Sequence, residues 1–160
     1  MPDKAVSSVA LPDLDEPALT AVAARLASRV GTGAVIHLVG PLGAGKTTFA
    51  RALLQVLGVG ERVKSPTYSL IESYSVDGLA IHHLDLYRIA ASEELEWLGL
   101  ADLDQAATLW LIEWPERAPG AVPPADLVVN LKHAEAARDL RLDALTDRGR
   151  DWLADFQVLN

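Results

Sequence analysis

The chain has 160 residues, with 14 Lys and Arg against 22 Asp and Glu, which gives a formal net charge of −8 at pH 7. Phosphate neutralisation along a nucleic acid needs clustered cationic side chains, so this charge argues against strong autonomous binding of nucleic acid. The sequence has no cysteine and no apolar run near the length of about 18 residues that a membrane span requires, so we expect one cytoplasmic domain over residues 1–160, without disulfides or thiolate metal sites.

The first third of the chain predicts a strand, a helix, a second strand and a second helix. Residues 6–11 fit a short strand, and Asp15 with Pro17 fits the start of a helix whose apolar residues recur at helical spacing as far as Val30. The continuous apolar run 34–39 is typical of a strand covered on both faces. A glycine-rich loop over 40–45 then leads into a helix over 46–57, closed by Gly58.

An antiparallel hairpin is predicted in the middle of the chain. Residues 68–76 and 79–86 flank Asp77 and Gly78, the dipeptide best suited to a two-residue type I′ turn. A hairpin beside buried strands favours a mixed sheet.

The remaining residues predict short elements that alternate with loops. In chain order we expect a short acidic helix from Ser92 to Gly99, a buried strand over 108–112, a loop over 117–124, strands over 127–131 and 140–145 joined by a polar, Ala-rich stretch around 133–137, and a terminal helix carrying Trp152, Leu153 and Phe156.

The glycine-rich loop carries the strongest functional signal. Residues 40–47, Gly-Pro-Leu-Gly-Ala-Gly-Lys-Thr, match the P-loop pattern G-x-x-x-x-G-K-[ST] between a predicted strand and a predicted helix. Glycines allow the backbone N–H groups to surround a phosphate, and the helix N-terminus adds a favourable dipole. Lys46 is expected to reach the β and γ phosphates and Thr47 to ligate Mg²⁺. An ordinary glycine-rich turn does not need this Lys-Thr pair.

Chemistry at a P-loop also needs a carboxylate near the metal. Two predicted strands end in an acid, one at Asp85 and the other at Glu113. Residue type alone does not separate them: either is the Mg²⁺-side acid, and the other polarises water or simply ends a strand.

Four further residues are candidates for roles around the site. His82 and His83 are neighbours on a strand and point to opposite faces, so we expect structural or supporting roles rather than a shared metal ion. Trp114 is either a stacking wall for a base or a core residue. Thr67 lies where P-loop GTPases keep a switch segment that senses the γ-phosphate.

The class of nucleotide follows from what the sequence lacks. No Asn-Lys-x-Asp guanine clamp occurs, which favours ATP over GTP. A small-molecule kinase is the main alternative, although Arg88, Arg117, Arg138 and Arg141 are scattered and do not form an evident lid. A nucleotide-gated binding module is the third hypothesis.

The chain resembles the TsaE family, formerly YjeE, the bacterial ATPases of tRNA threonylcarbamoyladenosine biosynthesis. The resemblance covers about residues 40–126 and keeps the order of the family's motifs. It is carried by LGAGKTT at 42–48, VKSPTY at 63–68, HLDLYR at 83–88, EELE at 93–96 and LIEWP at 111–115.

The resemblance implies a three-layer α/β P-loop NTPase fold with a central mixed parallel and antiparallel sheet. It implies that ATP is bound by residues 42–48, namely Leu42, Gly43, Ala44, Gly45, Lys46, Thr47 and Thr48, together with Trp114. It makes Thr47 and Asp85 the Mg²⁺ ligands, and it places Glu113 on the water or γ-phosphate side, with Lys46 and Thr67 as the other catalytic candidates.

The resemblance also implies the biology. Members act with TsaB and TsaD, and TsaD transfers the threonylcarbamoyl group to adenosine 37 of tRNAs that read ANN codons. Hydrolysis of ATP is expected to be weak without these partners, and tRNA is expected to be held mainly by them. One departure is Pro41, which stands where the family usually carries an acid. Proline removes one N–H at the loop entrance, and we expect phosphate binding to survive.

Overall fold

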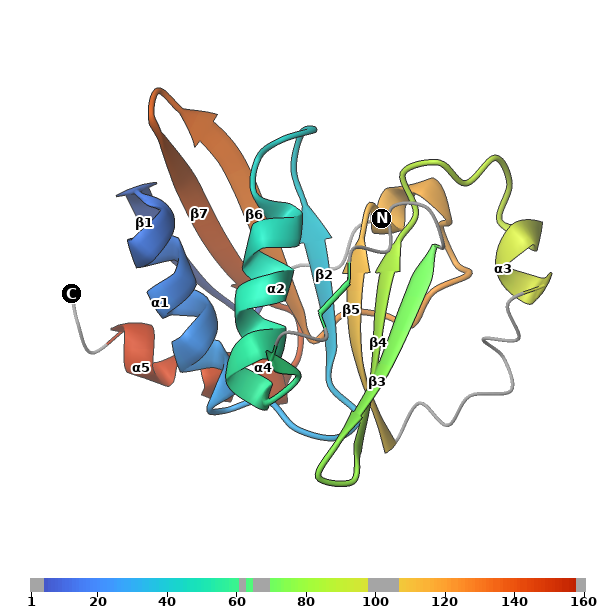
Figure 1. Cartoon of the computed structure of the whole chain (residues 1–160). Coiled ribbons are helices and arrows are strands. Elements are labelled where there is room, and N and C mark those ends of the chain that lie inside the picture. Colours follow the sequence, from blue (N-terminus) through green and yellow to red (C-terminus); the bar gives the residue numbers. More distant parts are fainter. Residues whose placement is uncertain (1–4, 61–62, 65–69, 98–106, 158–160) are drawn as a thin grey trace.

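The computed structural model describes residues 5–60, 63–64, 70–97 and 107–157. Within these ranges seven strands form one mixed sheet in the order β1-β7-β6-β2-β5-β4-β3 (Figure 1). The strands are β1 (Ser7–Leu14), β2 (Val35–Val39), β3 (Ile71–Val76), β4 (Leu79–Asp85), β5 (Thr108–Glu113), β6 (Leu127–Ala134) and β7 (Ala137–Ala144). The helices are α1 (Glu16–Ala27), α2 (Lys46–Leu57), α3 (Glu93–Trp97), the 3₁₀ turn η4 (Pro115–Arg117), α4 (Asp147–Trp152) and α5 (Ala154–Gln157).

Four neighbouring strands run parallel and place their carboxyl ends at one edge of the sheet. β2 pairs in parallel with β5 and β6, and β5 pairs in parallel with β4. Asp85 at the end of β4 lies in register with Glu113 at the end of β5, which in turn lies beside Leu38 of β2. Ligands of open α/β sheets bind outside this edge, and the P-loop leaves β2 there.

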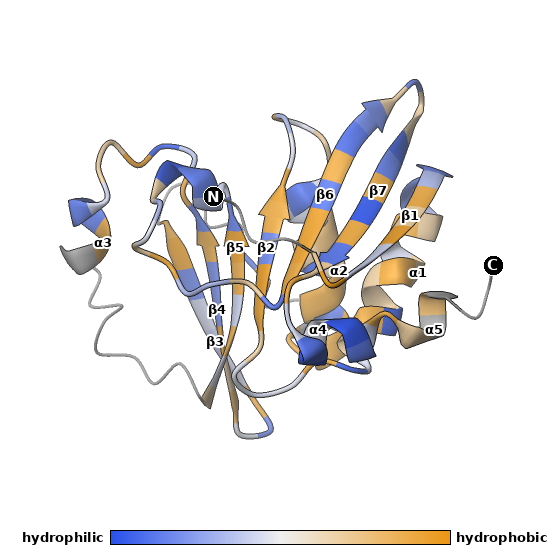
Figure 2. Cartoon of the chain, turned by 180° about the vertical axis from the view of Figure 1, so that it is seen from behind, coloured by the Kyte–Doolittle hydropathy of each residue, from blue (hydrophilic) through white to orange (hydrophobic). Residues whose placement is uncertain are grey.

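The two faces of the sheet are covered differently. The larger core lies between the sheet and α1, α2 and the C-terminal helices, and includes Leu26, Phe49 and Trp152. On the opposite face a smaller cluster gathers around the fully buried Trp110 and includes Leu95 of α3. Figure 2 shows polar and apolar residues alternating along β6 and β7, as expected where neighbouring side chains point to opposite faces of the sheet. These observations confirm an α/β fold with a mixed central sheet.

Elements with local capping signals have the predicted form. Asp15 caps α1 by accepting a hydrogen bond from the Ala18 N–H at 2.9 Å. α2 spans the predicted 46–57, and Gly58 ends it with φ 111°. Asp77 and Gly78 both have positive φ, at 49° and 83°, as a type I′ turn requires.

Other bounds differ from the predictions. β1 continues to Leu14 with an irregular register after Leu11, where Asp13 takes a φ of 58°. The predicted terminal helix is divided into α4 and α5. The predicted hairpin start at residue 68 and helix end at Gly99 lie outside the described residues.

The largest difference is the polar stretch around 133–137, which we predicted as a connection between two strands. β6 and β7 instead continue through it and leave a two-residue turn at Glu135 and Ala136, with Glu135 at φ 53°. This antiparallel end of the hairpin extends beyond the neighbouring strands, as Figure 1 shows, and Lys132 and Glu135 there are exposed to solvent.

The described helices are also short. None of them is long and apolar enough to cross a membrane.

Candidate functional site

The P-loop connects β2 to α2 and is shaped by three glycines. Gly43 and Gly45 have φ values of 76° and 105°, which side chains with a Cβ rarely adopt. Gly40, with φ 155°, lies so close to β6 that a Cβ there would collide with the carbonyl oxygen of Leu131. The loop is therefore packed against the sheet at its entrance and free to curve at its tip.

Lys46 is held at the base of this loop. Its side chain is only 5% exposed, and Nζ donates to the carbonyl oxygens of Gly40 at 2.6 Å and Pro41 at 2.9 Å. Burial lowers the pKa of Lys46, while the negative charge of Glu113 opposes that change. Pro41 lacks an N–H, but its carbonyl accepts from both Lys46 and the Ala44 N–H, so the departure at Pro41 preserves these bonds.

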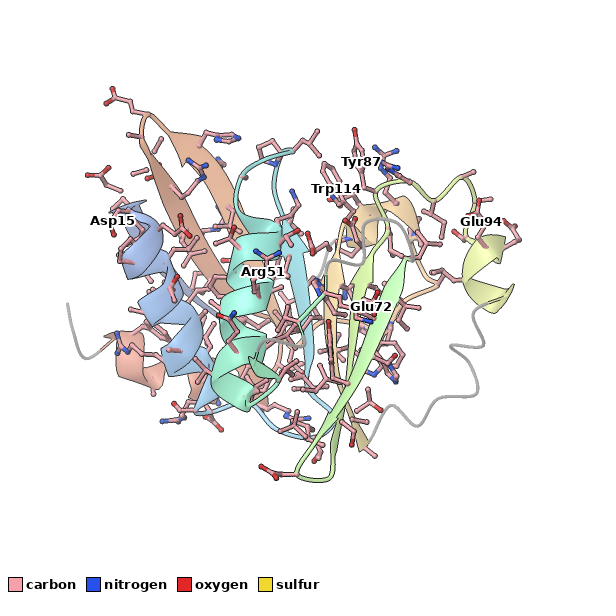
Figure 3. The ribbon with its side chains drawn as sticks, in the orientation of Figure 1. Asp15, Arg51, Glu72, Tyr87, Glu94 and Trp114 are labelled. Atoms are coloured by element: carbon pink, nitrogen blue, oxygen red, sulfur yellow. The ribbon has the colours of Figure 1, made fainter. Side chains whose placement is uncertain are left out.

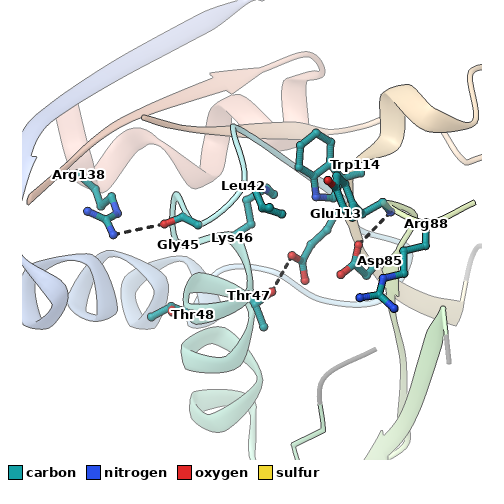
Figure 4. A pocket seen from close by; sticks show the side chains of 12 residues that line it. Leu42, Gly45, Lys46, Thr47, Thr48, Asp85, Arg88, Glu113, Trp114 and Arg138 are labelled. Carbon is teal, nitrogen blue, oxygen red and sulfur yellow. Dashed lines mark hydrogen bonds between the residues drawn. The ribbon is translucent and has the colours of Figure 1, made fainter. Parts of the chain in front are cut away.

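Thr47 and the two acids come together beside Lys46 (Figure 4). The Thr47 hydroxyl donates to Glu113 Oε1 at 2.8 Å, and His83 Nε2 lies 2.7 Å from Glu113 Oε2. Asp85 accepts a hydrogen bond from the Tyr87 N–H at 3.1 Å. Burial raises the pKa of Asp85, and the charge of Glu113 adds to this effect.

A cavity of about 370 Å³ joins these residues. Most of the predicted site residues line this cavity, and they lie either in the P-loop and the start of α2 or at the ends of β4 and β5. Its lining consists of Leu42, Gly43, Gly45, Lys46, Thr47, Thr48, Asp85, Tyr87, Arg88, Glu113, Trp114 and Arg138. Ala44 is fully buried behind the loop, and Thr67 lies outside the described residues.

An aromatic pair forms one side of the cavity. Trp114 follows β5 in a left-handed conformation, with φ 58° and ψ 49°, and its ring lies 4.9 Å from the ring of Tyr87 (Figure 3). Lys46 Nζ lies 4.3 Å from the centre of the Trp114 ring. The left-handed backbone turns the chain directly after Glu113, which places the Trp114 ring over Lys46 and at the edge of the smaller apolar cluster.

The β6–β7 hairpin forms the opposite side, a contribution that the sequence did not reveal. His133 Nε2 lies 3.2 Å from the Leu42 carbonyl oxygen, and an Arg138 N–H donates to the Gly43 carbonyl oxygen at 3.3 Å. A second cavity, of about 140 Å³, adjoins the first and shares Gly45, Thr48 and Arg138 with it. Of the four arginines considered in the sequence, Arg88 and Arg138 line the larger cavity, whereas Arg141 on the same strand as Arg138 pairs with Asp143 at 3.0 Å.

The donor set suits Mg²⁺ bound together with a nucleotide. Among the described residues, no three His, Cys, Asp or Glu side chains gather as a metal-binding group. Thr47 and Asp85 instead offer one hydroxyl and one carboxylate beside a phosphate loop, and Mg²⁺ typically takes one or two carboxylates plus phosphate oxygens and water.

Comparison with known proteins places this site in a family context. A family model described as threonylcarbamoyl adenosine biosynthesis protein TsaE matches residues 14–140. A Haemophilus influenzae protein named tRNA threonylcarbamoyladenosine biosynthesis protein TsaE is 44% identical over 122 residues, covering 76% of this chain and 77% of the relative. A Bacillus subtilis protein of the same name is 33% identical over 129 residues, covering 80% of each chain.

A solved structure is similar in fold. The crystal structure of YdiB from Bacillus subtilis superposes with a TM-score of 0.76 and covers 96% of both chains. At 23% sequence identity, this likeness supports the fold alone.

Proposed function

Because the chain belongs to the TsaE family of threonylcarbamoyl adenosine biosynthesis proteins, we propose that it is a Mg²⁺-dependent ATPase of tRNA modification. It acts with homologues of TsaB and TsaD, and its hydrolysis of ATP sustains repeated transfer of the threonylcarbamoyl group to adenosine 37 of tRNAs that read ANN codons. Hydrolysis by the isolated chain is weak.

The observation that carries this proposal is the meeting of a P-loop lysine, a hydroxyl and two carboxylates on one cavity. Lys46 and Thr47 come from the start of α2, while Asp85 and Glu113 come from the ends of two adjacent parallel strands. Phosphoryl transfer depends on positioning and charge stabilisation, which these groups supply.

The two adjoining cavities support one orientation of the nucleotide. Lys46 and Trp114 lie together on the wall of the large cavity, with 4.3 Å between Nζ and the ring centre, and Lys46 is the group expected to meet the β and γ phosphates. The small cavity shares Thr48 and Arg138 with the large one and is also lined by Leu14, Leu19 and Ala137, among others. We therefore place the base in the small cavity and Trp114 beside the phosphates.

The two acids take different parts. Thr47 and Asp85 hold Mg²⁺, which when bound neutralises phosphate charge. Glu113 orients the attacking water, and its contact with Thr47 keeps it beside the metal site. The formal charge of −8 agrees with tRNA being held mainly by the partner proteins.

ATP hydrolysis by the chain alone, compared with hydrolysis after TsaB, TsaD and tRNA are added, tests the proposal. We expect the partners to accelerate hydrolysis and tRNA modification to depend on it. An unchanged rate together with phosphorylation of a metabolite would instead identify a small-molecule kinase. Full modification by a hydrolysis-deficient variant would identify a nucleotide-gated binding module.

A further inference from the structure

A buried histidine contacts Glu113 from behind the site. His83 lies on β4 and Glu113 on the neighbouring strand β5, and their side chains are 1% and 2% exposed. His83 pairs in register with Leu111, so its ring reaches along the strand to Glu113, with 2.7 Å between Nε2 and Oε2. Both side chains are therefore almost fully buried, and Glu113 also reaches the wall of the larger cavity.

Glu113 is thereby held at both carboxylate oxygens. Oε2 faces His83, and Oε1 accepts the hydrogen bond from the Thr47 hydroxyl at 2.8 Å. Two partners on opposite oxygens fix the plane of the carboxylate, so it cannot rotate without breaking one of these bonds. The free lone pairs of the same oxygens are left for the site.

The other ring nitrogen identifies the tautomer. Among the described residues, His83 Nδ1 is buried and has no hydrogen-bond partner. With the proton on Nε2, His83 donates to Glu113 and Nδ1 needs no donor of its own. The reverse tautomer would bury an unpaired N–H and turn a lone pair toward the carboxylate, which is costly.

We propose that His83 is a positioning residue: its Nε2–H holds the Glu113 carboxylate toward Thr47 and the metal site. The inference rests on the proposed ATPase function for its consequence, since Glu113 must be oriented to act on water. The contact itself is independent of that function. Residues that orient a reacting carboxylate in this way affect turnover more than ground-state binding.

Two amide variants separate positioning from packing. In His83→Gln the amide nitrogen can occupy the place of Nε2, whereas in His83→Asn the same group is one methylene too short. In the complex with TsaB, TsaD and tRNA, we expect His83→Asn to lower kcat about 10- to 100-fold, while His83→Gln stays within about threefold of wild type. The Kd for ATP should change less than about threefold in both.

His82→Asn is the matched control. His82 is the next residue on β4 and points to the other face, where Nδ1 lies 2.6 Å from Ser73 Oγ and the ring packs against Trp110. The His82→Asn variant should therefore leave kcat unchanged. Wild-type kcat in His83→Asn, or an equal loss in His83→Gln, would overturn the inference, because either result would mean that the donor at Nε2 does no positioning.

A tautomer measurement decides the contact without any activity. Long-range nitrogen-proton NMR spectra of the histidine rings should show His83 of the full chain as the Nε2–H form. Averaged tautomers, or an Nδ1–H form, would overturn the inference even if ATP hydrolysis is normal. If the spectra show the Nε2–H form but the wild-type protein does not hydrolyse ATP even with its partners, the proposed function is contradicted and the contact is still supported.

Discussion

Replacing Asp85 by Asn isolates the charge of one acid from its shape. Asp85 is 8% exposed and accepts a hydrogen bond from the Tyr87 N–H through Oδ1, which an Asn oxygen in the same position also accepts. The substitution therefore removes a negative charge while keeping the local turn. Any large effect on nucleotide binding then arises from electrostatics.

The size of the effect follows from Coulomb's law. A carboxylate and a divalent cation about 4 Å apart attract each other by about 8 kcal/mol at an effective dielectric constant of about 20. Loss of repulsion between the carboxylate and the phosphates offsets more than half of this, leaving on the order of 3 kcal/mol, or about a 100-fold weaker affinity for Mg-ATP. Affinity for ATP without Mg²⁺ should stay equal or improve.

The same substitution should stabilise the ligand-free chain. Burial raises the pKa of Asp85, which means that the ionised carboxylate is disfavoured where it stands. A neutral amide avoids this cost, so we expect the free energy of unfolding to increase by about 0.5–2 kcal/mol.

Calorimetry with and without Mg²⁺, urea unfolding and single-turnover hydrolysis measure the three effects. Glu113→Gln is the matched control: it should leave Mg-ATP affinity nearly intact and slow hydrolysis. The reverse pattern would exchange the roles of the two acids. Equal, mild effects in both variants would refute the reasoning and place the chemistry on Thr67 or on a partner residue.

Other predictions concern single residues elsewhere in the chain. Lys46→Ala should reduce ATP affinity at least about 100-fold, measured by calorimetry, because we expect its ammonium to face the phosphates when nucleotide is bound; wild-type affinity would remove Lys46 from the site. Trp114 should change fluorescence on ATP titration when the other three tryptophans are Phe, since its ring lies 4.3 Å from Lys46 Nζ; a flat titration at saturation would contradict this placement. Burial lowers the pKa of His37, so the unfolded chain takes up a proton at this residue first as pH falls below about 6.5. The free energy of unfolding then falls by up to about 1.4 kcal/mol per pH unit. In urea unfolding, His37→Gln should lose less stability over that range, and parallel pH curves would count against it. Gly149→Ala should lower the free energy of unfolding by about 1–3 kcal/mol without changing ATP affinity, because its Cβ would collide with the Asp126 carbonyl oxygen; unchanged thermal unfolding would show that the chain relaxes there.

Local signals predicted the elements that carry them. α2 has its predicted bounds because Gly58 ends it in a left-handed conformation, and the hairpin turn at Asp77 and Gly78 has the required positive φ values. The extended β6–β7 hairpin was missed because its polar residues look like a loop in sequence. The residues at this end of the hairpin are polar or small, so they lack the apolar alternation that would reveal a strand.

In the candidate site, too, local signals predicted some residues, whereas contacts between distant residues were not predicted. Lys46 and Thr47 were found from contiguous motif residues, and Asp85 and Glu113 from their positions at strand ends. The contact of Glu113 with His83 joins residues 30 positions apart and depends on the register between β4 and β5. No local pattern encodes that register, so residue types alone did not separate the two acids, and their assignment rested on the resemblance.

The order of strands also bears on how the protein is made. β1 pairs with β7, so Ser7 finds its partner Ala144 only after most of the chain has been synthesised. The loop entrance at Gly40 likewise lies against Leu131, and Arg138 contacts the loop tip. A growing chain on the ribosome thus carries the whole P-loop motif long before its supports exist, and we expect the loop to take its final shape only when the last hairpin has emerged and closed these distant pairings.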